Sequence, residues 1–346
     1  MIKTVCIVSL SRGILGEPRV KHELDIGVRR LEAYGLNVRF AKHALAGLEQ
    51  LDAHPERRAQ DLLDAFSDPE IDLILCAIGG NDTYRLAPYL FDGDALKNAL
   101  SNKVFLGFSD TTVNHFMLHK LGLPTFYGQA FLPDVCEIGK TMLPYSERYF
   151  AELLKTGTIH EIRPANVWYR NRTSFAPDQV GTELTPHPDH GFVLLQGAPV
   201  FSGPILGGCI DSIAEMLDGT LDHSVGRKMT AVTEQYGLFP SHDGWKERIL
   251  LLESSEMRMP PETYRSALLA LKRRGVFDAV CGVLVGKPMD EVYHSEYSKI
   301  ITEVIDDPSL PVVYNVNVGH ALPRCIVPFG VAATVDVNEQ RITFAP

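Results

Sequence analysis

The sequence predicts a two-domain α/β protein built on mostly parallel sheets. Short apolar runs alternate with amphipathic stretches along most of the chain, which is the pattern of βαβ units. The chain has 346 residues, more than the roughly 100–200 residues of a typical single domain, so we expect two domains. Hydrophobic residues make up 45% of the chain and charged residues 22%. This composition is typical of a globular protein with a sizeable core and excludes an intrinsically disordered one.

The first half contains the clearest βαβ pattern. Apolar runs predict strands at Val5–Leu10, Asn37–Ala41, Asp72–Ile78 and Val104–Phe108. Apolar residues at helical spacing predict helices at Val20–Tyr34, Gln60–Ser67 and Thr111–Leu121. In parallel sheets, ligands bind outside the carboxyl ends of the strands. We therefore expect a site in the loops that follow Ile78 and Phe108.

The middle of the chain differs in composition from both halves. Over residues 163–191, Asn, Arg, Thr, Pro, Asp and His dominate and the apolar periodicity fades, which is typical of a linker or an exposed loop. We therefore expect an N-terminal domain over residues 1–165, a linker over 166–191 and a C-terminal domain over 192–346.

The second half repeats the alternation of strands and helices. Strands are expected at Phe192–Leu195, Arg248–Leu252, Ala279–Val285 and Val312–Val316, and helices at Ile210–Leu217, Pro261–Arg274 and Tyr297–Ile305. The glycine-rich stretch Gly203–Gly208 predicts a tight turn leading into the helix that starts at Ile210. The segments Val331–Val337 and Arg341–Phe344 predict a terminal hairpin.

Charge and cysteine usage exclude some classes of function and location. The chain has 33 Lys and Arg against 43 Asp and Glu, a net charge of −10, which argues against binding polymeric nucleic acid. None of the six cysteines forms a CxxC motif, and a chain of this size folds without disulfides, so a reducing compartment fits best. The N-terminal apolar run is too short for a signal peptide, and no stretch approaches a membrane span. We expect a cytoplasmic protein with no membrane contact.

Ser109 is the first candidate for catalysis. It follows the apolar run Phe105–Phe108 and precedes a predicted helix, which is the strand–turn–helix setting of a nucleophile elbow. Such a turn lifts a hydroxyl out of the sheet and directs helical N–H groups at a developing oxyanion. The G-x-S-x-G pattern is only half met, because Thr111 replaces the second glycine. Alternatively, Ser109 or Asp110 simply caps the helix.

A glycine pair follows the preceding buried strand. In Gly79-Gly80-Asn81-Asp82, backbone N–H groups are suited to form an anion-binding nest, either an oxyanion hole or a phosphate cradle. The alternative is an ordinary tight turn. The stretch also loosely resembles the Gly-Gly-Asp motif of NAD kinases, but Asn81 stands at the position of that aspartate.

An acid and a base follow two further strands. Glu253 ends the apolar run Ile249–Leu252, and His320 follows another predicted strand. A histidine there is suited to act as the general base for a serine, oriented by a carboxylate. The chain order Ser109, Glu253, His320 is that of α/β-hydrolase triads. Alternatively, His320 is an ordinary surface histidine, and Glu253 is solvated or caps a helix. The same alternative role applies to Glu256, which follows three residues later.

The remaining candidates carry weaker signals. His115 and His119 share one helix face, but no glutamate completes an H-E-x-x-H motif. The sequence therefore predicts neither a metal nor an organic cofactor. Trp168 and Tyr169 lie in the polar middle segment, where an aromatic ring either stacks on a planar ligand or packs over the domain junction.

Seven stretches, taken together, resemble a known family. They lie in the right order along nearly the whole chain, at Ile78–Asp82, Val104–Thr112, Leu123–Pro133, Leu195–Gly219, Ile249–Glu256, Gly282–Pro288 and Val316–Pro323. The combination resembles the LD-carboxypeptidase family of serine peptidases (S66), and most closely its microcin C self-immunity (MccF-like) branch. The matches around Phe126–Pro133 and Cys209 favour that branch.

The resemblance implies a fold and a mechanism. The family fold is a flavodoxin-like or amidotransferase-like N-terminal domain with helices on both faces of a mostly parallel sheet, and a smaller swivel-type β/α C-terminal domain. The implied triad is Ser109, Glu253 and His320, with backbone N–H groups of Gly80 and Asp110 as the oxyanion hole. Family members are usually homodimers.

The resemblance also implies substrate classes. Family enzymes release D-alanine from murein tetrapeptide, whereas the MccF-like branch cuts the amide that joins an acyl-aspartate to a modified nucleotide. For the latter class we expect three residues to contact the substrate: Asn81, Trp168 and Gly208.

The sequence leaves four alternative functions, in this order of preference. The first is a serine carboxypeptidase or amidase acting on a small peptide or aminoacyl-nucleotide, without metal or organic cofactor. The second is a murein tetrapeptide carboxypeptidase of peptidoglycan recycling. The others are a nucleotide kinase using the Gly79-Gly80 turn and a non-catalytic protein that binds a ligand.

Overall fold

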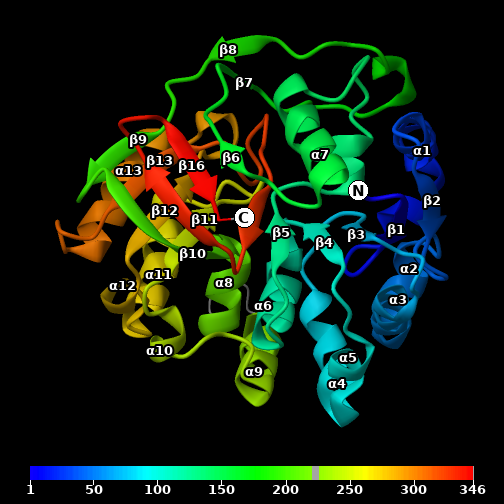
Figure 1. Cartoon of the computed structure of the whole chain (residues 1–346), viewed down its shortest axis with the longest axis horizontal. Helices are drawn as coiled ribbons and strands as arrows, with labels where there is room; N and C mark the ends of the chain where they lie inside the picture. Colours follow the sequence, from blue (N-terminus) through cyan, green and yellow to red (C-terminus); the bar gives the residue numbers. More distant parts are fainter. Residues whose placement is uncertain (220–225, 346) are drawn as a thin grey trace. The chain divides into compact units, whose positions relative to one another are not determined.

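The computed structural model describes residues 1–219 and 226–345 and divides them between two compact units (Figure 1). Unit 1 consists of residues 1–158 and 172–184, and unit 2 of residues 159–171 and 185–346. The chain therefore passes between the units three times. None of the described helices is long and apolar enough to cross a membrane.

Unit 1 contains a parallel sheet whose own strands follow the order β5-β4-β3-β1-β2. These strands are β1 (Thr4–Val8), β2 (Asn37–Phe40), β3 (Leu73–Cys76), β4 (Val104–Gly107) and β5 (Thr125–Tyr127). Its helices are α1 (Lys21–Ala33), α2 (Leu48–Ala53), α3 (Pro55–Ser67), α4 (Ala87–Phe91), α5 (Ala95–Ala99), α6 (Thr112–Lys120) and α7 (Pro144–Thr156). Strands β1 and β3 are buried at every residue, which explains their continuous apolar runs.

Unit 2 contains a mixed sheet in the order β6-β16-β15-β10-β11-β12-β13-β9. Its strands are β6 (Glu161–Ile162), β9 (Val193–Gln196), β10 (Val200–Cys209), β11 (Ile249–Glu253), β12 (Gly282–Gly286), β13 (Val312–Val316), β15 (Ala332–Asp336) and β16 (Arg341–Phe344). Strands β10 to β13 are parallel, and antiparallel strands flank them on both sides. The predicted terminal hairpin is confirmed as β15 and β16.

The other elements of unit 2 are mostly helical. They are α8 (Ile210–Leu217), α9 (Gly226–Tyr236), α10 (His242–Trp245), α11 (Pro261–Arg273), α12 (Val276–Ala279), α13 (His294–Ile305) and the short strands β7 (Val167–Tyr169), β8 (Pro186–Pro188) and β14 (Val327–Phe329). The α/β fold class expected from the sequence is thus confirmed, and unit 2, expected to be the smaller domain, carries a sheet of eight described strands.

The predicted turn at Gly203–Gly208 was wrong, because these residues form the second half of the central strand β10. The reason is the close approach of the neighbouring strand. A Cβ on Gly207, whose φ is +148°, would lie 1.9 Å from the carbonyl oxygen of Leu251. Glycine is required here by the tight pairing of two strands and not by a reversal of the chain.

The middle segment, expected to be a linker or an exposed loop, contains residues of both units. Residues 172–184 belong to unit 1, whereas 159–171 and 185–191 belong to unit 2. Within unit 2, β7 pairs with β8 in antiparallel fashion, and the Tyr169 N–H donates to the carbonyl oxygen of Leu322 at 2.9 Å. The parts of this segment are therefore divided between the units, although most of its residues are exposed.

Candidate functional site

Ser109 stands on a strained turn between a strand and a helix in unit 1. Strand β4 ends at Gly107, Phe108 is extended, and Ser109 has a left-handed φ of +67°. A short 3₁₀ turn from Ser109 then leads into α6. The Ser109 N–H donates to the hydroxyl of Tyr127 at 3.1 Å. A half-buried serine in this conformation has the backbone geometry of a nucleophile elbow.

Two glycines make room for this turn. A Cβ on Gly79 would lie 2.7 Å from the Ser109 Oγ, and a Cβ on Gly107 would lie 2.6 Å from the Thr111 Oγ1. Both distances are far below a van der Waals contact, so neither position tolerates a side chain without a shift. Thr111, which replaces the second glycine of the elbow pattern, donates from its hydroxyl to the Phe108 carbonyl oxygen at 2.8 Å. The departure from the pattern is therefore accommodated by a hydrogen bond within the turn.

The side chain of Asp110 ties the elbow to the Gly79-Gly80 loop. Its Oδ2 accepts hydrogen bonds from the Ser11 hydroxyl at 2.5 Å and from the N–H groups of Asp82 and Thr83 at 3.0 and 2.9 Å. Asp82 in turn accepts two hydrogen bonds from the buried Arg58, at 2.7 and 2.9 Å. Burial raises the pKa of Asp110 to about 6 despite these hydrogen bonds. The Asp110 carboxylate thus orders the loop that carries Gly80.

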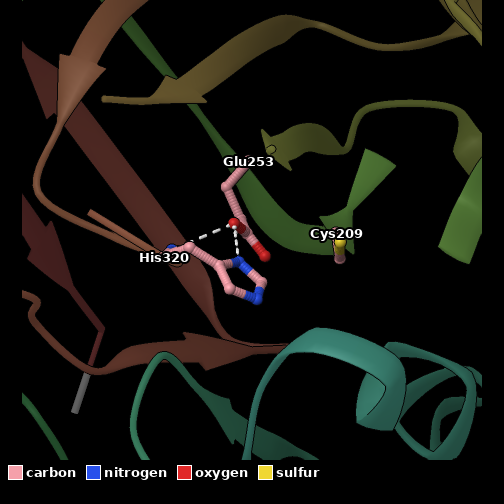
Figure 2. Close-up of side chains that lie close together, drawn as sticks. All are labelled: Cys209, Glu253 and His320. Carbon is pink, nitrogen blue, oxygen red and sulfur yellow. Dashed lines mark hydrogen bonds and ion pairs between the residues drawn. The ribbon is translucent and has the colours of Figure 1, made fainter. Parts of the chain in front are cut away.

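Glu253 and His320 form a buried pair in unit 2 (Figure 2). Glu253 is the last residue of β11, and His320 lies in the loop after β13. The His320 Nδ1 donates to the Glu253 Oε2 at 2.8 Å, and the His320 backbone N–H donates to the same oxygen at 3.1 Å. A carboxylate on Nδ1 fixes the ring orientation and leaves Nε2 as the nitrogen for proton transfer.

Close packing holds Glu253 in place. A Cβ on Gly319, whose φ is +87°, would lie 2.2 Å from the Glu253 Oε2, and a Cβ on Gly286 would lie 2.8 Å from the Glu253 Cβ. Cys209, the last residue of β10, is the register partner of Glu253. The carboxylate therefore occupies a space that two glycines leave open.

The structure adds one contact that the sequence did not predict. Glu256, for which the sequence left both a functional carboxylate and a solvated or helix-capping acid open, lies 3.0 Å through its Oε2 from the His320 Nε2. Burial lowers the pKa of His320, but the carboxylates of Glu253 and Glu256 outweigh it and raise that pKa to about 10. The hydrogen bond from His320 lowers the pKa of Glu256 to about 2. The two carboxylates therefore favour the imidazolium form of His320.

Among the described residues, one cluster has donor types suited to a metal ion. The ligand atoms of Cys209, Glu253 and His320 all lie within 4.8 Å of one another (Figure 2).

His115 has both ring nitrogens engaged, Nδ1 with the Thr125 hydroxyl at 2.7 Å and Nε2 with the Gly107 carbonyl oxygen at 3.1 Å. Burial lowers the pKa of His115 to about 3. His115 is thus a neutral core residue that supports the strand leading to Ser109.

The three residues expected to contact substrate have different environments. Asn81 is exposed in unit 1, and Gly208 is buried in β10 of unit 2. Trp168 is only 7% exposed, and its ring stacks on His187 at 4.6 Å between centroids, with the Lys287 Nζ 5.6 Å from the ring centre. Contact between these residues and a substrate remains a prediction.

Both halves of the chain match models of one family. The model of the LD-carboxypeptidase N-terminal domain matches residues 5–128, and that of the C-terminal domain matches residues 202–335. The chain belongs to the LD-carboxypeptidase (S66) family. Ser109 lies within the first matched region, and Glu253 and His320 lie within the second. Membership of the S66 family supports a peptidase or hydrolase activity.

Solved structures place the chain among the MccF-like members of the S66 family. It is 53% identical to an MccF-like protein from Streptococcus pneumoniae in complex with AMP, with a TM-score of 0.97 and coverage of 100% of this chain and 99% of that one. A structure of MccF in complex with aspartyl sulfamoyl adenosine has a TM-score of 0.79 at 22% identity, covering 99% and 96% of the two chains. The latter shows the common fold alone.

Two relatives of this chain bear on its function. The chain is 24% identical over 299 residues to the microcin C7 self-immunity protein MccF of Escherichia coli, covering 83% of this chain and 78% of that protein. It is also 34% identical over 105 residues to the murein tetrapeptide carboxypeptidase of Pseudomonas aeruginosa, covering 30% of this chain and 34% of that protein. The relatives of this chain therefore include a self-immunity protein and, over a shorter stretch, a murein tetrapeptide carboxypeptidase.

Sequence reasoning overlooked the side chains of Asp110 and Glu256. For Asp110 it considered only the backbone N–H and a helix cap, although an aspartate directly after a proposed nucleophile signals a carboxylate next to the site. Glu256 lies three residues beyond Glu253, so it shares the loop that leaves the same strand end. That proximity was the available signal for a second carboxylate near His320.

Proposed function

We propose that this S66 protein is a serine hydrolase that cleaves an amide bond in aminoacyl-nucleotide substrates, acting in the cytoplasm through Ser109, Glu253 and His320. The proposal rests chiefly on the buried Glu253–His320 pair, with its 2.8 Å hydrogen bond on Nδ1. The left-handed elbow at Ser109 supports it independently. Ser109 belongs to unit 1, and Glu253 and His320 belong to unit 2.

Each group has a defined task in the proposed reaction. The Ser109 Oγ attacks the scissile carbonyl carbon while the His320 Nε2 takes its proton. The N–H groups of Gly80 and Asp110 stabilise the oxyanion. His320 then protonates the leaving amine, and water hydrolyses the acyl-enzyme in the same manner. Glu253 keeps the ring oriented and stabilises the imidazolium form.

The relatives support the substrate class. The S. pneumoniae neighbour was solved with AMP and MccF with aspartyl sulfamoyl adenosine, so an adenylate-like leaving group fits the MccF-like members. We propose Asn81, Trp168 and Gly208 as contacts to that ligand. The partial match to a murein tetrapeptide carboxypeptidase keeps the tetrapeptide as the second candidate substrate.

The decisive experiment combines a nucleophile variant with a substrate panel. Purified protein is incubated with aspartyl sulfamoyl adenosine and with murein tetrapeptide, and products are followed by mass spectrometry. Ser109→Ala should lower kcat by on the order of 10⁶, as loss of a triad nucleophile does. Ser67→Ala, at an exposed serine of the same unit, is the matched control and should retain full activity. Undiminished hydrolysis by Ser109→Ala would refute the serine mechanism.

We also propose a homodimer, as the resemblance implies. Light scattering coupled to size exclusion should give about twice the chain mass of 38.4 kDa. A mass equal to that of one chain would contradict this assembly.

A further inference from the structure

The contact between Glu256 and His320 conflicts with the proposed mechanism as it stands. The mechanism needs the His320 Nε2 to accept a proton from Ser109, but that nitrogen lies 3.0 Å from the Glu256 carboxylate. Nδ1 donates to Glu253 at the same time. A ring with a carboxylate on each nitrogen carries both protons and cannot act as a base. One carboxylate therefore has to leave before catalysis begins.

The two glutamates differ in how easily they can move. The Glu253 side chain is 0% exposed, and a backbone N–H and closely packed glycines hold it. The Glu256 side chain is 60% exposed, and its contact to His320 is made by one oxygen. Glu256 is thus the displaceable partner, and its movement requires no rearrangement of the core.

The charges around His320 define what displaces Glu256. The half-buried carboxyl of Asp211 accepts hydrogen bonds from the Ser255 N–H at 3.0 Å and hydroxyl at 2.7 Å, and desolvation raises its pKa. The hydrogen bond from His320 and its charge lower the pKa of Glu256 most, and the charge of the buried Arg324 contributes less. Glu256 therefore offers an exposed carboxylate next to the general base. A cationic substrate group is attracted to it, and an anionic group is repelled.

We propose that Glu256 is a specificity-determining residue that selects substrates with an ammonium group next to the scissile carbonyl. The ammonium takes the Glu256 carboxylate as its acceptor, the carboxylate leaves Nε2, and the proton held there passes to solvent water. Nε2 then acts as the base. An α-ammonium is characteristic of aminoacyl amides, whereas the leaving residue of a carboxypeptidase substrate bears a carboxylate. This inference rests on the proposed function and narrows its substrate class to amides with a free α-ammonium, in contrast to the acyl-aspartate amides that the resemblance implies.

The test compares substrates that differ only in this charge. Wild type, Glu256→Gln and Glu262→Gln are assayed on aspartyl sulfamoyl adenosine and its N-acetyl derivative. Glu262 is an exposed glutamate near the start of α11 in the same unit. Wild type and Glu262→Gln should favour the free ammonium by about 10–100-fold in kcat/KM, the range expected for a hydrogen bond between charged groups. Glu256→Gln should reduce this preference to about threefold or less.

A pH profile and a binding measurement separate the outcomes. On the N-acetyl substrate, the acidic limb of kcat/KM should move to lower pH in Glu256→Gln, because Nε2 loses a carboxylate that favours its protonated form. The same preference should appear as a ratio of dissociation constants in a Ser109→Ala background, where turnover is absent. Unchanged selectivity and an unchanged profile in Glu256→Gln would overturn the role of Glu256. Hydrolysis of neither substrate by wild type would instead count against the proposed function, and the binding ratio would still decide on Glu256.

Discussion

Replacing Ser109 by glycine should stabilise the protein while it removes the proposed nucleophile. Ser109 has a φ of +67°, and a left-handed conformation costs an L-residue roughly 1–2 kcal/mol. Glycine relieves this strain but loses about 0.4–1 kcal/mol through the greater freedom of the unfolded chain. The difference is a net gain of about 0.8 kcal/mol. For a unit of this size that corresponds to a rise of about 2–3 °C in Tm.

The matched control is Ser109→Ala, which loses the same hydroxyl but keeps the Cβ and hence the strain. Both tryptophans, Trp168 and Trp245, lie in unit 2, so tryptophan fluorescence follows unit 2 while far-UV circular dichroism follows the whole chain. Urea unfolding followed by circular dichroism should give a higher free energy of unfolding for Ser109→Gly than for Ser109→Ala. The reasoning is refuted if the glycine variant is equal to or less stable than the alanine variant.

Three further predictions concern the acid, its packing and the elbow carboxylate. Glu253→Gln should lower kcat by about 10⁴ with little change in KM, because His320 loses the charge that fixes its ring; a loss below tenfold would contradict the assignment. Gly319→Ala should reduce kcat and lower the Tm, since its Cβ would lie 2.2 Å from the Glu253 Oε2 at a φ of +87°; wild-type kcat would show that the loop adapts. Burial raises the pKa of Asp110 from 3.8 to about 6 in the folded state, so the folded protein binds this proton more tightly than the unfolded chain. Wild type should therefore lose stability relative to Asp110→Asn as the pH rises from about 4 to about 6. If urea unfolding gives the same pH dependence of the unfolding free energy for both proteins over that range, this prediction is wrong.

The sequence was most informative where burial imposes a pattern. Strands such as β3 and β11 are buried throughout, and their continuous apolar runs predicted them to within about two residues. The glycines of β10 were misread, because glycine marks both a reversal of the chain and a close approach of two strands. Short helices such as α4 and α5 have too few residues to show a periodic apolar face.

The candidate site was only partly predictable for a related reason. The positions of Glu253 and His320 at strand ends suggested an acid and a base, and the structure pairs them. The position of Glu256 three residues after Glu253 indicated only that it leaves the same strand end. Its contact with the other ring nitrogen depends on the path of two loops. The hydrogen bonds of Asp110 to Asp82 and Thr83 likewise join separate loops, and their burial sets a pKa that composition does not reveal.

The three passages of the chain between the units determine how the protein can be divided. A cut after Thr158 gives a fragment without residues 172–184, which belong to unit 1. That piece is bound there by an ion pair between Arg172 and Glu137 at 2.6 Å and by the Gly181 N–H, which donates to the Ile138 carbonyl oxygen at 2.7 Å. Separate expression of the two family-matched regions therefore produces an incomplete first half. A self-contained version of unit 1 needs residues 1–158 joined to 172–184 by a short connection that replaces 159–171.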